Sequence, residues 1–178
     1  MLKLVEANEK YLKEYKEAYL EYVNLIEKDI IHRHNQMFLN PDETDVIKYF
    51  NDSKDINKVP KGLAPSYDYF FVDDDKLIGI IRIRIYLTDY LLQYGGNIGY
   101  GINPRYFKQG YGTKLLKLGL EKAKELIKED KVLVTCDDDN IGSYKIIEKN
   151  GGILENKVMI TDAGETFLTR RYWIKMRW

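Results

Sequence analysis

The segment that most constrains the fold joins an apolar, strand-like run to a helix through a loop with two glycines. The run ends near Ile102, the loop contains Gly110 and Gly112, and the helix begins near Thr113. Glycine lets the backbone approach a ligand closely. The first N–H groups of a helix lack intrahelical partners and carry partial positive charge. A strand, a glycine loop and a helix in this order therefore predict a site for a phosphate-bearing cofactor.

The loop differs from the two commonest phosphate-binding motifs. No G-x-x-x-x-G-K-[ST] string occurs, and G-x-G-x-x-G fails because Leu115 stands three residues after Gly112. The segment from Gly110 to Thr113 instead resembles the pyrophosphate-binding segment of the GNAT acyltransferases, [QR]-x-x-G-x-[GA]. The alternative is a solvated turn between strand and helix, in which the glycines only allow the backbone to turn and no ligand binds.

A second segment carries the same resemblance. After an apolar run at 132–136, the chain reads N-I-G-S-Y-K-I-I-E-K-N-G-G from residue 140. This is similar to the family's second cofactor-contacting segment, N-x-x-[AS]-x-x-x-Y-x-K-x-G-F. Asn140, Ser143, Lys149 and Gly151 match, whereas Ile147 and Gly152 stand where tyrosine and phenylalanine are usual.

The resemblance implies a GNAT-type acyltransferase fold of the mixed α/β (α+β) class. We therefore expect a central, mostly antiparallel sheet of six to seven strands with helices on both faces, in one domain spanning 1–178. Hydrophobic periodicity and turn signals predict helices over 9–27, 40–51, 113–129 and 141–149, and strands over 2–5, 67–72, 77–87, 96–102, 132–136, 153–160 and 166–175.

Composition narrows the class of partner. The 28 lysines and arginines balance the 28 aspartates and glutamates, so no overall field favours nucleic acid or an anionic membrane. The N-terminus does not read as a signal peptide, and apolar runs are too short for a membrane span. The single cysteine suits a reducing cytoplasm. We expect a cytoplasmic monomer or homodimer.

The resemblance also implies acetyl-CoA as co-substrate, without a metal, held largely by backbone N–H groups of the loop. The residues expected to bind it are Ile102, Lys108, Gln109, Gly110, Tyr111, Gly112, Thr113, Asn140 and Ser143. Phe107 replaces the family's glutamine or arginine, so Arg105 or Lys108 is expected to supply the missing cation; otherwise each is a solvated loop charge. Asn140 is also a good helix N-cap, and the two roles are compatible.

In this family the strand that corresponds to 97–102 diverges from its neighbour, and the pantetheine arm pairs with the freed edge. An N–H group there polarises the thioester carbonyl, a role typically worth ~3 kcal/mol. Gly99 and Gly101 predict a close backbone approach and a bulge. Asn97 and Tyr100 stand where the family often has a glutamate, and both are candidate catalytic residues.

The sequence indicates the general base and the general acid of the reaction less clearly than the cofactor site. An amine must lose a proton before it attacks, so a base or a water chain is expected; Asp137 is a candidate relay or a solvated turn residue. Tyr144, nearly one turn before Ile147, is a candidate acid for the leaving thiol or a packing residue. Cys136 is expected to be a small buried residue rather than an acyl carrier.

The remaining polar and aromatic candidates lie in the first third of the chain and in the second hairpin strand. His32 and His34 have no third ligand nearby in sequence, so loop residues are favoured over a metal site. Tyr19, Tyr22 and Tyr86 are candidates for the wall of the acceptor cleft.

The predicted function is an acetyl-CoA-dependent N-acetyltransferase acting by direct attack in a ternary complex. The expected acceptor is a primary amine on a small molecule or a protein N-terminus. One alternative keeps the cofactor but transfers another acyl group. A second is a non-catalytic acetyl-CoA sensor or interaction module, which the missing tyrosine and the missing strand glutamate favour.

Overall fold

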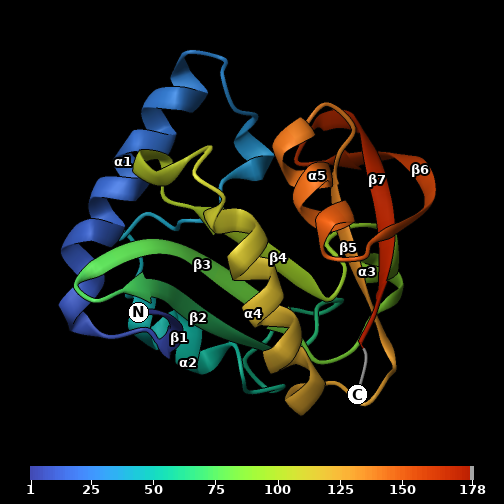
Figure 1. Ribbon diagram of the computed structural model, residues 1–178, viewed down its shortest axis with the longest axis horizontal. Helices are drawn as coiled ribbons and strands as arrows, with labels where there is room; N and C mark the ends of the chain where they lie inside the picture. The colour runs from blue at the N-terminus through green and yellow to red at the C-terminus, as the bar shows by residue number, and fades with distance from the viewer. Residues whose placement is uncertain (177–178) are drawn as a thin grey trace.

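The computed structural model describes residues 1–176, which form a seven-stranded sheet with helices on both faces (Figure 1). The strand order is β1-β2-β3-β4-β5-β7-β6. In this part of the chain every neighbouring pair is antiparallel except β4 and β5, which run parallel. The strands are β1 (Leu2–Glu6), β2 (Ser66–Asp73), β3 (Lys76–Arg84), β4 (Ile98–Ile102), β5 (Lys131–Asp137), β6 (Ile153–Asp162) and β7 (Glu165–Lys175), and the helices are α1 (Leu12–Glu27), α2 (Val46–Asp52), α3 (Asp89–Gln93), α4 (Tyr111–Leu126) and α5 (Ile141–Lys149).

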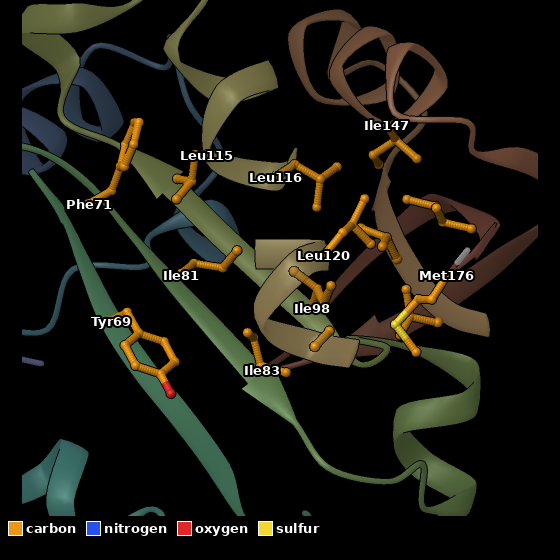
Figure 2. Close-up of a cluster of buried hydrophobic side chains, with 14 of the residues drawn as sticks. Tyr69, Phe71, Ile81, Ile83, Ile98, Leu115, Leu116, Leu120, Ile147 and Met176 are labelled. Atoms are coloured by element: carbon orange, nitrogen blue, oxygen red, sulfur yellow. The ribbon is translucent and has the colours of Figure 1, made fainter. Parts of the chain in front are cut away.

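Side chains of β3 alternate between the two faces of the sheet, which separates two hydrophobic layers. Ile81 and Ile83 pack in one cluster with Leu115, Leu116 and Leu120 of α4, as Figure 2 shows. Ile80 points the other way, into the layer formed by α1 and α2. The sheet therefore has one face covered by α4 and α5 and an opposite face covered by α1 and α2.

Close packing of α4 on the sheet depends on a small residue. A methyl group at Gly119 would lie 2.2 Å from Cδ1 of Ile81, so glycine lets the helix backbone come near the strand. Likewise, a methyl group at Gly112 would lie 2.3 Å from Cδ1 of Ile146, on α5. The second glycine of the motif thus lies within α4 and serves the packing of this helix against α5.

Several predicted boundaries were wrong. Asn40 does not start the second helix, because its side chain accepts the N–H of Asp42 in a local turn, a geometry that competes with helix formation. The helix starts at Val46, after Asp45 accepts the N–H of Lys48. The short helix α3 was not predicted, and β3 ends at Arg84 rather than at 87.

Other predictions are confirmed. The short first strand exists, and α5 ends at Lys149, shortly before Gly151, whose φ of +85° is left-handed as expected of a helix stop. The β6–β7 hairpin turns at Ala163 and Gly164, both with positive φ. None of the helices within residues 1–176 combines the length and the apolar character of a membrane span.

Candidate active site

The parallel strands β4 and β5 separate soon after they meet. Within residues 1–176 these two strands are paired at one position, Ile98 with Val134. Beyond this pair, β4 continues to Ile102 and β5 to Asp137. The strands therefore diverge toward their C-terminal ends and leave backbone groups there without a neighbouring strand. The predicted divergent strand is present, but its register with β3 is regular from Ile98 to Ile102, so the predicted bulge in β4 is not formed.

The freed edge of β4 offers N–H groups to the gap. Asn97 O accepts from Arg84 N and Asn103 N donates to Ile78 O, so odd-numbered residues face β3. Because these groups alternate along a strand, Tyr100 and Ile102 turn their N–H groups toward the gap. The carbonyl of Ile102 is already paired, since it accepts the hydroxyl of Tyr22 at 2.7 Å.

The loop before α4 has the predicted free backbone donors. Within residues 1–176, the N–H groups from Lys108 to Thr113 have no backbone or side-chain acceptor. Lys108 and Gly110 both have positive φ, +58° and +80°. A run of unpaired N–H groups at the N-terminus of a 16-residue helix is an arrangement that binds an anion.

The two candidate loop cations differ. Arg105 donates from Nε to Glu21 and from Nη1 to Glu17, both at 2.7 Å, so it is held on α1. The prediction that Arg105 supplies the phosphate cation is therefore not supported by its position. Lys108 is exposed and has no ion-pair partner in the part of the chain that the structure describes.

The start of α5 meets β4 across the gap. Asn140 caps the helix, with its side chain accepting the N–H of Ser143 at 3.0 Å. Ser143 Oγ lies 2.9 Å from the hydroxyl of Tyr100 on β4. Burial raises the pKa of Tyr100, so this phenol stays neutral and acts as a hydrogen-bond donor.

Cys136 lies on the same side, at the end of β5. Burial raises the pKa of its thiol to about 12, with a smaller opposing contribution from the hydroxyl of Ser143. Because the thiolate is the nucleophilic form, the environment favours an inert thiol.

The other two candidate catalytic residues have different surroundings. Asn97 is 3% exposed, and its side chain accepts from Leu133 N at 2.9 Å and donates to Arg84 O at 3.3 Å. It thus ties three strands together where the gap closes. Tyr144 stacks against the guanidinium of Arg170, whose Cζ lies 3.9 Å from the ring centroid.

The opposite side of the gap is covered by the connection between α1 and α2, here called the crossing loop (residues 32–39). Methyl groups on Gly99 and Gly101 would lie 3.3 and 3.0 Å from atoms of Met37. Phe38 is buried in the α1–α2 layer. The two strand glycines therefore make room for this loop, and the approach of a cofactor arm that they predict stays a prediction.

The crossing loop brings His34 to the end of β5. His34 Nε2 lies 2.6 Å from Asp137 Oδ2, and Nδ1 lies 3.0 Å from Glu165 Oε2. Its ring stacks on Phe167 with centroids 3.8 Å apart, and the side chains of His34 and Asp137 are 8% and 4% exposed. Each ring nitrogen of His34 therefore faces a carboxylate oxygen.

Sequence reasoning missed this cluster, because 103 residues separate His34 from Asp137. The sequence shows no third ligand near the two histidines, whereas the fold places Asp137 and Asp139 beside them. His32 also has a carboxylate, Asp139, at 2.9 Å, and this hydrogen bond raises the pKa of His32. The signal available in the sequence was the acidic turn after a buried strand, which named Asp137 but not its partner. Tyr22 is one of the tyrosines expected at the wall of the acceptor cleft, but its hydroxyl instead donates to the carbonyl of Ile102.

Comparisons with known proteins identify relatives of this chain. A family model described as the acetyltransferase (GNAT) domain matches residues 12–153. The uncharacterized N-acetyltransferase YnaD of Bacillus subtilis (strain 168) is 25% identical over 123 residues, which cover 60% of this chain and 70% of that protein.

Solved structures share the fold over nearly the whole chain. The microcin C7 self-immunity acetyltransferase MccE, in complex with acetyl-CoA and AMP, superposes with a TM-score of 0.69 at 16% identity, covering 98% of this chain and 92% of that one. A GNAT-family acetyltransferase from Bacillus anthracis gives 0.66 at 21% identity, with 98% and 95% covered. These likenesses confirm the predicted fold class.

Proposed function

This chain belongs to the GNAT acetyltransferase family and is an acyltransferase enzyme, and we propose that it moves an acetyl group from acetyl-CoA to a primary amine by direct attack in a ternary complex. The acceptor is a small molecule or a protein N-terminus. The observation that carries this proposal is the set of unpaired N–H groups from Lys108 to Thr113, which lead directly to the open edge of β4.

The residues present fit the co-substrate. The loop N–H groups would hold the pyrophosphate, with Gln109, Tyr111 and Gly112 contributing through their backbone. The remaining predicted contacts are Ile102 in the gap and the pair Asn140 and Ser143 at the start of α5. Acetyl-CoA supplies a thioester: the amine nitrogen bonds to the acetyl carbon as the carbon–sulfur bond breaks.

The N–H groups of Tyr100 and Ile102 would polarise the thioester carbonyl, because they point into the gap without a partner strand. Such a donor is typically worth ~3 kcal/mol. Asn97 would act by holding the closed end of the gap rather than by touching the substrate, since its side chain is occupied by β3 and β5.

Proton transfer would use groups on both sides of the gap between β4 and β5. Asp137 and His34 would accept the proton that the attacking ammonium must lose, either directly or through water. Tyr144 would give a proton to the leaving thiolate, whose conjugate acid has a pKa near ~8.5 and which therefore needs little assistance. Ile147, where the family usually has its tyrosine, is fully buried and apolar.

The test measures release of the coenzyme A thiol on incubation of the protein with acetyl-CoA and a panel of primary amines. We expect release with at least one amine, together with acetyl-CoA binding by calorimetry. Binding without release from any amine would contradict acetyl transfer to amines and favour a sensor of the same fold. No binding of acetyl-CoA at all would contradict the proposal that the loop N–H groups hold its pyrophosphate.

A further inference from the structure

Arg84, the last residue of β3, has a guanidinium that the protein uses only in part. Nη1 donates to the carbonyls of Gly95 and Gly96, both at 3.1 Å. Nε and Nη2 find no acceptor among residues 1–176. These two nitrogens form one edge of the guanidinium, the edge that matches two oxygens of a carboxylate or phosphate.

Arg84 also lacks a carboxylate in ion-pair contact, again within the described chain. The nearby buried carboxylate, Asp68, is held by Arg82 Nε at 2.6 Å. Burial, followed by the positive charge of Arg82, lowers the pKa of Arg84 to about 10. The two arginines therefore leave unbalanced positive charge on this face, which a bound anion would offset.

The Arg84 side chain lines a cavity and also lies against β4, the strand that borders the gap. It lines a cavity of ≈ 680 Å³ bounded by α2, the connection after it and β3. On the other side, Nη1 lies 3.9 Å from the point where a Cβ on Gly99 would stand. The other cations lining the cavity are paired with carboxylates: Lys48 and Lys58 with Asp52, and Arg82 with Asp68.

Tyr94 connects this cation with the acidic end of the site. Burial, together with the charges of Asp137 and Asp162, raises the pKa of Tyr94 to about 12, and the charge of Arg84 opposes this shift. Its ring packs against Phe167, on which His34 stacks. The acceptor side of the gap therefore has a cation at one end and carboxylates at the other, with Tyr94 between them.

We infer that Arg84 binds an anionic group, a carboxylate or a phosphate, carried by the amine acceptor. The amine of the same molecule would face Asp137 and His34, so the acceptor is an amine with a negative group rather than a polycation. This inference rests on the proposed function, because it assigns the acceptor class of the same site.

The first test compares matched acceptors in the thiol-release assay: amino acids and phosphorylated amines against the corresponding amides and alcohols. The wild-type protein should prefer the anionic member of a pair, and the carboxylate and phosphate arms identify the group. Arg84→Gln should reduce that preference about tenfold or more while leaving acetyl-CoA affinity unchanged. Lys58→Gln, on the rim of the same cavity, is the matched control and should keep the preference.

The second test does not require turnover. Calorimetry in the presence of coenzyme A compares N-acetylglycine with N-acetylglycinamide and N-acetyl-O-phosphoethanolamine with N-acetylethanolamine. Binding of an anionic member that is lost in Arg84→Gln and kept in Lys58→Gln supports the site even if no amine is acetylated, in which case only the proposed function fails. Equal binding of each pair, or no binding of either anionic ligand, overturns the inference, as does a loss in Arg84→Gln that tracks a lowered unfolding midpoint.

Discussion

The two sides of the gap between β4 and β5 are built in different ways. On the α4–α5 side, the groups proposed to bind acetyl-CoA come from two continuous segments, residues 98–113 and 136–144. They act mostly through backbone N–H groups and helix ends. On the opposite side, the crossing loop, the end of β3, Tyr94, Asp137 and the start of β7 each contribute one or two side chains.

This difference predicts that a single glycine matters on one side of the gap and a pair of distant side chains on the other. A backbone site tolerates changes of side chain but depends on φ and on the space before the helix. A site assembled from side chains depends on each segment arriving at the correct place. The predictions below test this contrast, from the largest expected effect to the smallest.

Gly110→Glu should abolish acetyl-CoA binding, with an affinity loss of at least ~100-fold, or about 2.8 kcal/mol. The position has φ +80° and open space around it, so the new carboxylate is placed beside the loop N–H groups and repels the diphosphate. Calorimetry measures the affinity, and circular dichroism checks the fold. Gly110→Asn is the matched control, because asparagine tolerates left-handed φ. Unchanged acetyl-CoA affinity in Gly110→Glu would contradict the proposal that the loop N–H groups bind the pyrophosphate.

His34→Gln should lower kcat about 100-fold, within the usual range for a group that transfers protons. Glutamine keeps a donor for Asp137 but cannot exchange the proton. The loss should appear in the thiol-release assay with acetyl-CoA affinity unchanged. His32→Gln is the control, since His32 is 57% exposed and pairs with Asp139. If both variants retain full turnover, the cluster holds the crossing loop and takes no proton.

Tyr144→Phe should lower turnover about tenfold, because the leaving thiolate needs only modest assistance. The ring, and with it the stacking on Arg170, is retained. Turnover is measured at saturating acetyl-CoA. A variant as active as the wild type would show that Tyr144 serves packing alone.

Tyr22→Phe should destabilise the protein by ~1–3 kcal/mol, because the buried carbonyl of Ile102 loses its hydrogen bond. Urea unfolding measures the change in free energy. Tyr19→Phe, on the same helix, is the comparison. Equal stability of Tyr22→Phe and the wild type would mean that water satisfies the Ile102 carbonyl.

Cys136→Ala should leave acetyl transfer nearly unchanged. The raised pKa, about 12, means that the thiol stays protonated at pH 8 and becomes a thiolate only as the pH approaches that value. Maleimide labelling of the folded wild type at pH 8 should therefore be slow and should accelerate on unfolding. Rapid labelling together with inactive Cys136→Ala would instead support an acyl-cysteine.

Features that depend on neighbouring residues were predictable. The glycine loop before α4, the Asn140 cap and the left-handed Gly151 each follow from local backbone geometry, and hydrophobic periodicity placed Leu116 and Leu120 in the core. The same reasoning failed at Asn40, where a local side-chain hydrogen bond competes with the helix start.

Pairings between distant segments were not predictable in this way. The sequence shows that Arg105 is near the loop, but only the packing of α1 against it turns the guanidinium to Glu17 and Glu21. Nothing local to His34 indicates that it meets Asp137. Backbone conformation and cap chemistry act over a few residues and are therefore encoded in the motif itself. The partners of a side chain are decided when helices and strands pack, since packing alone sets which distant groups come within hydrogen-bond reach.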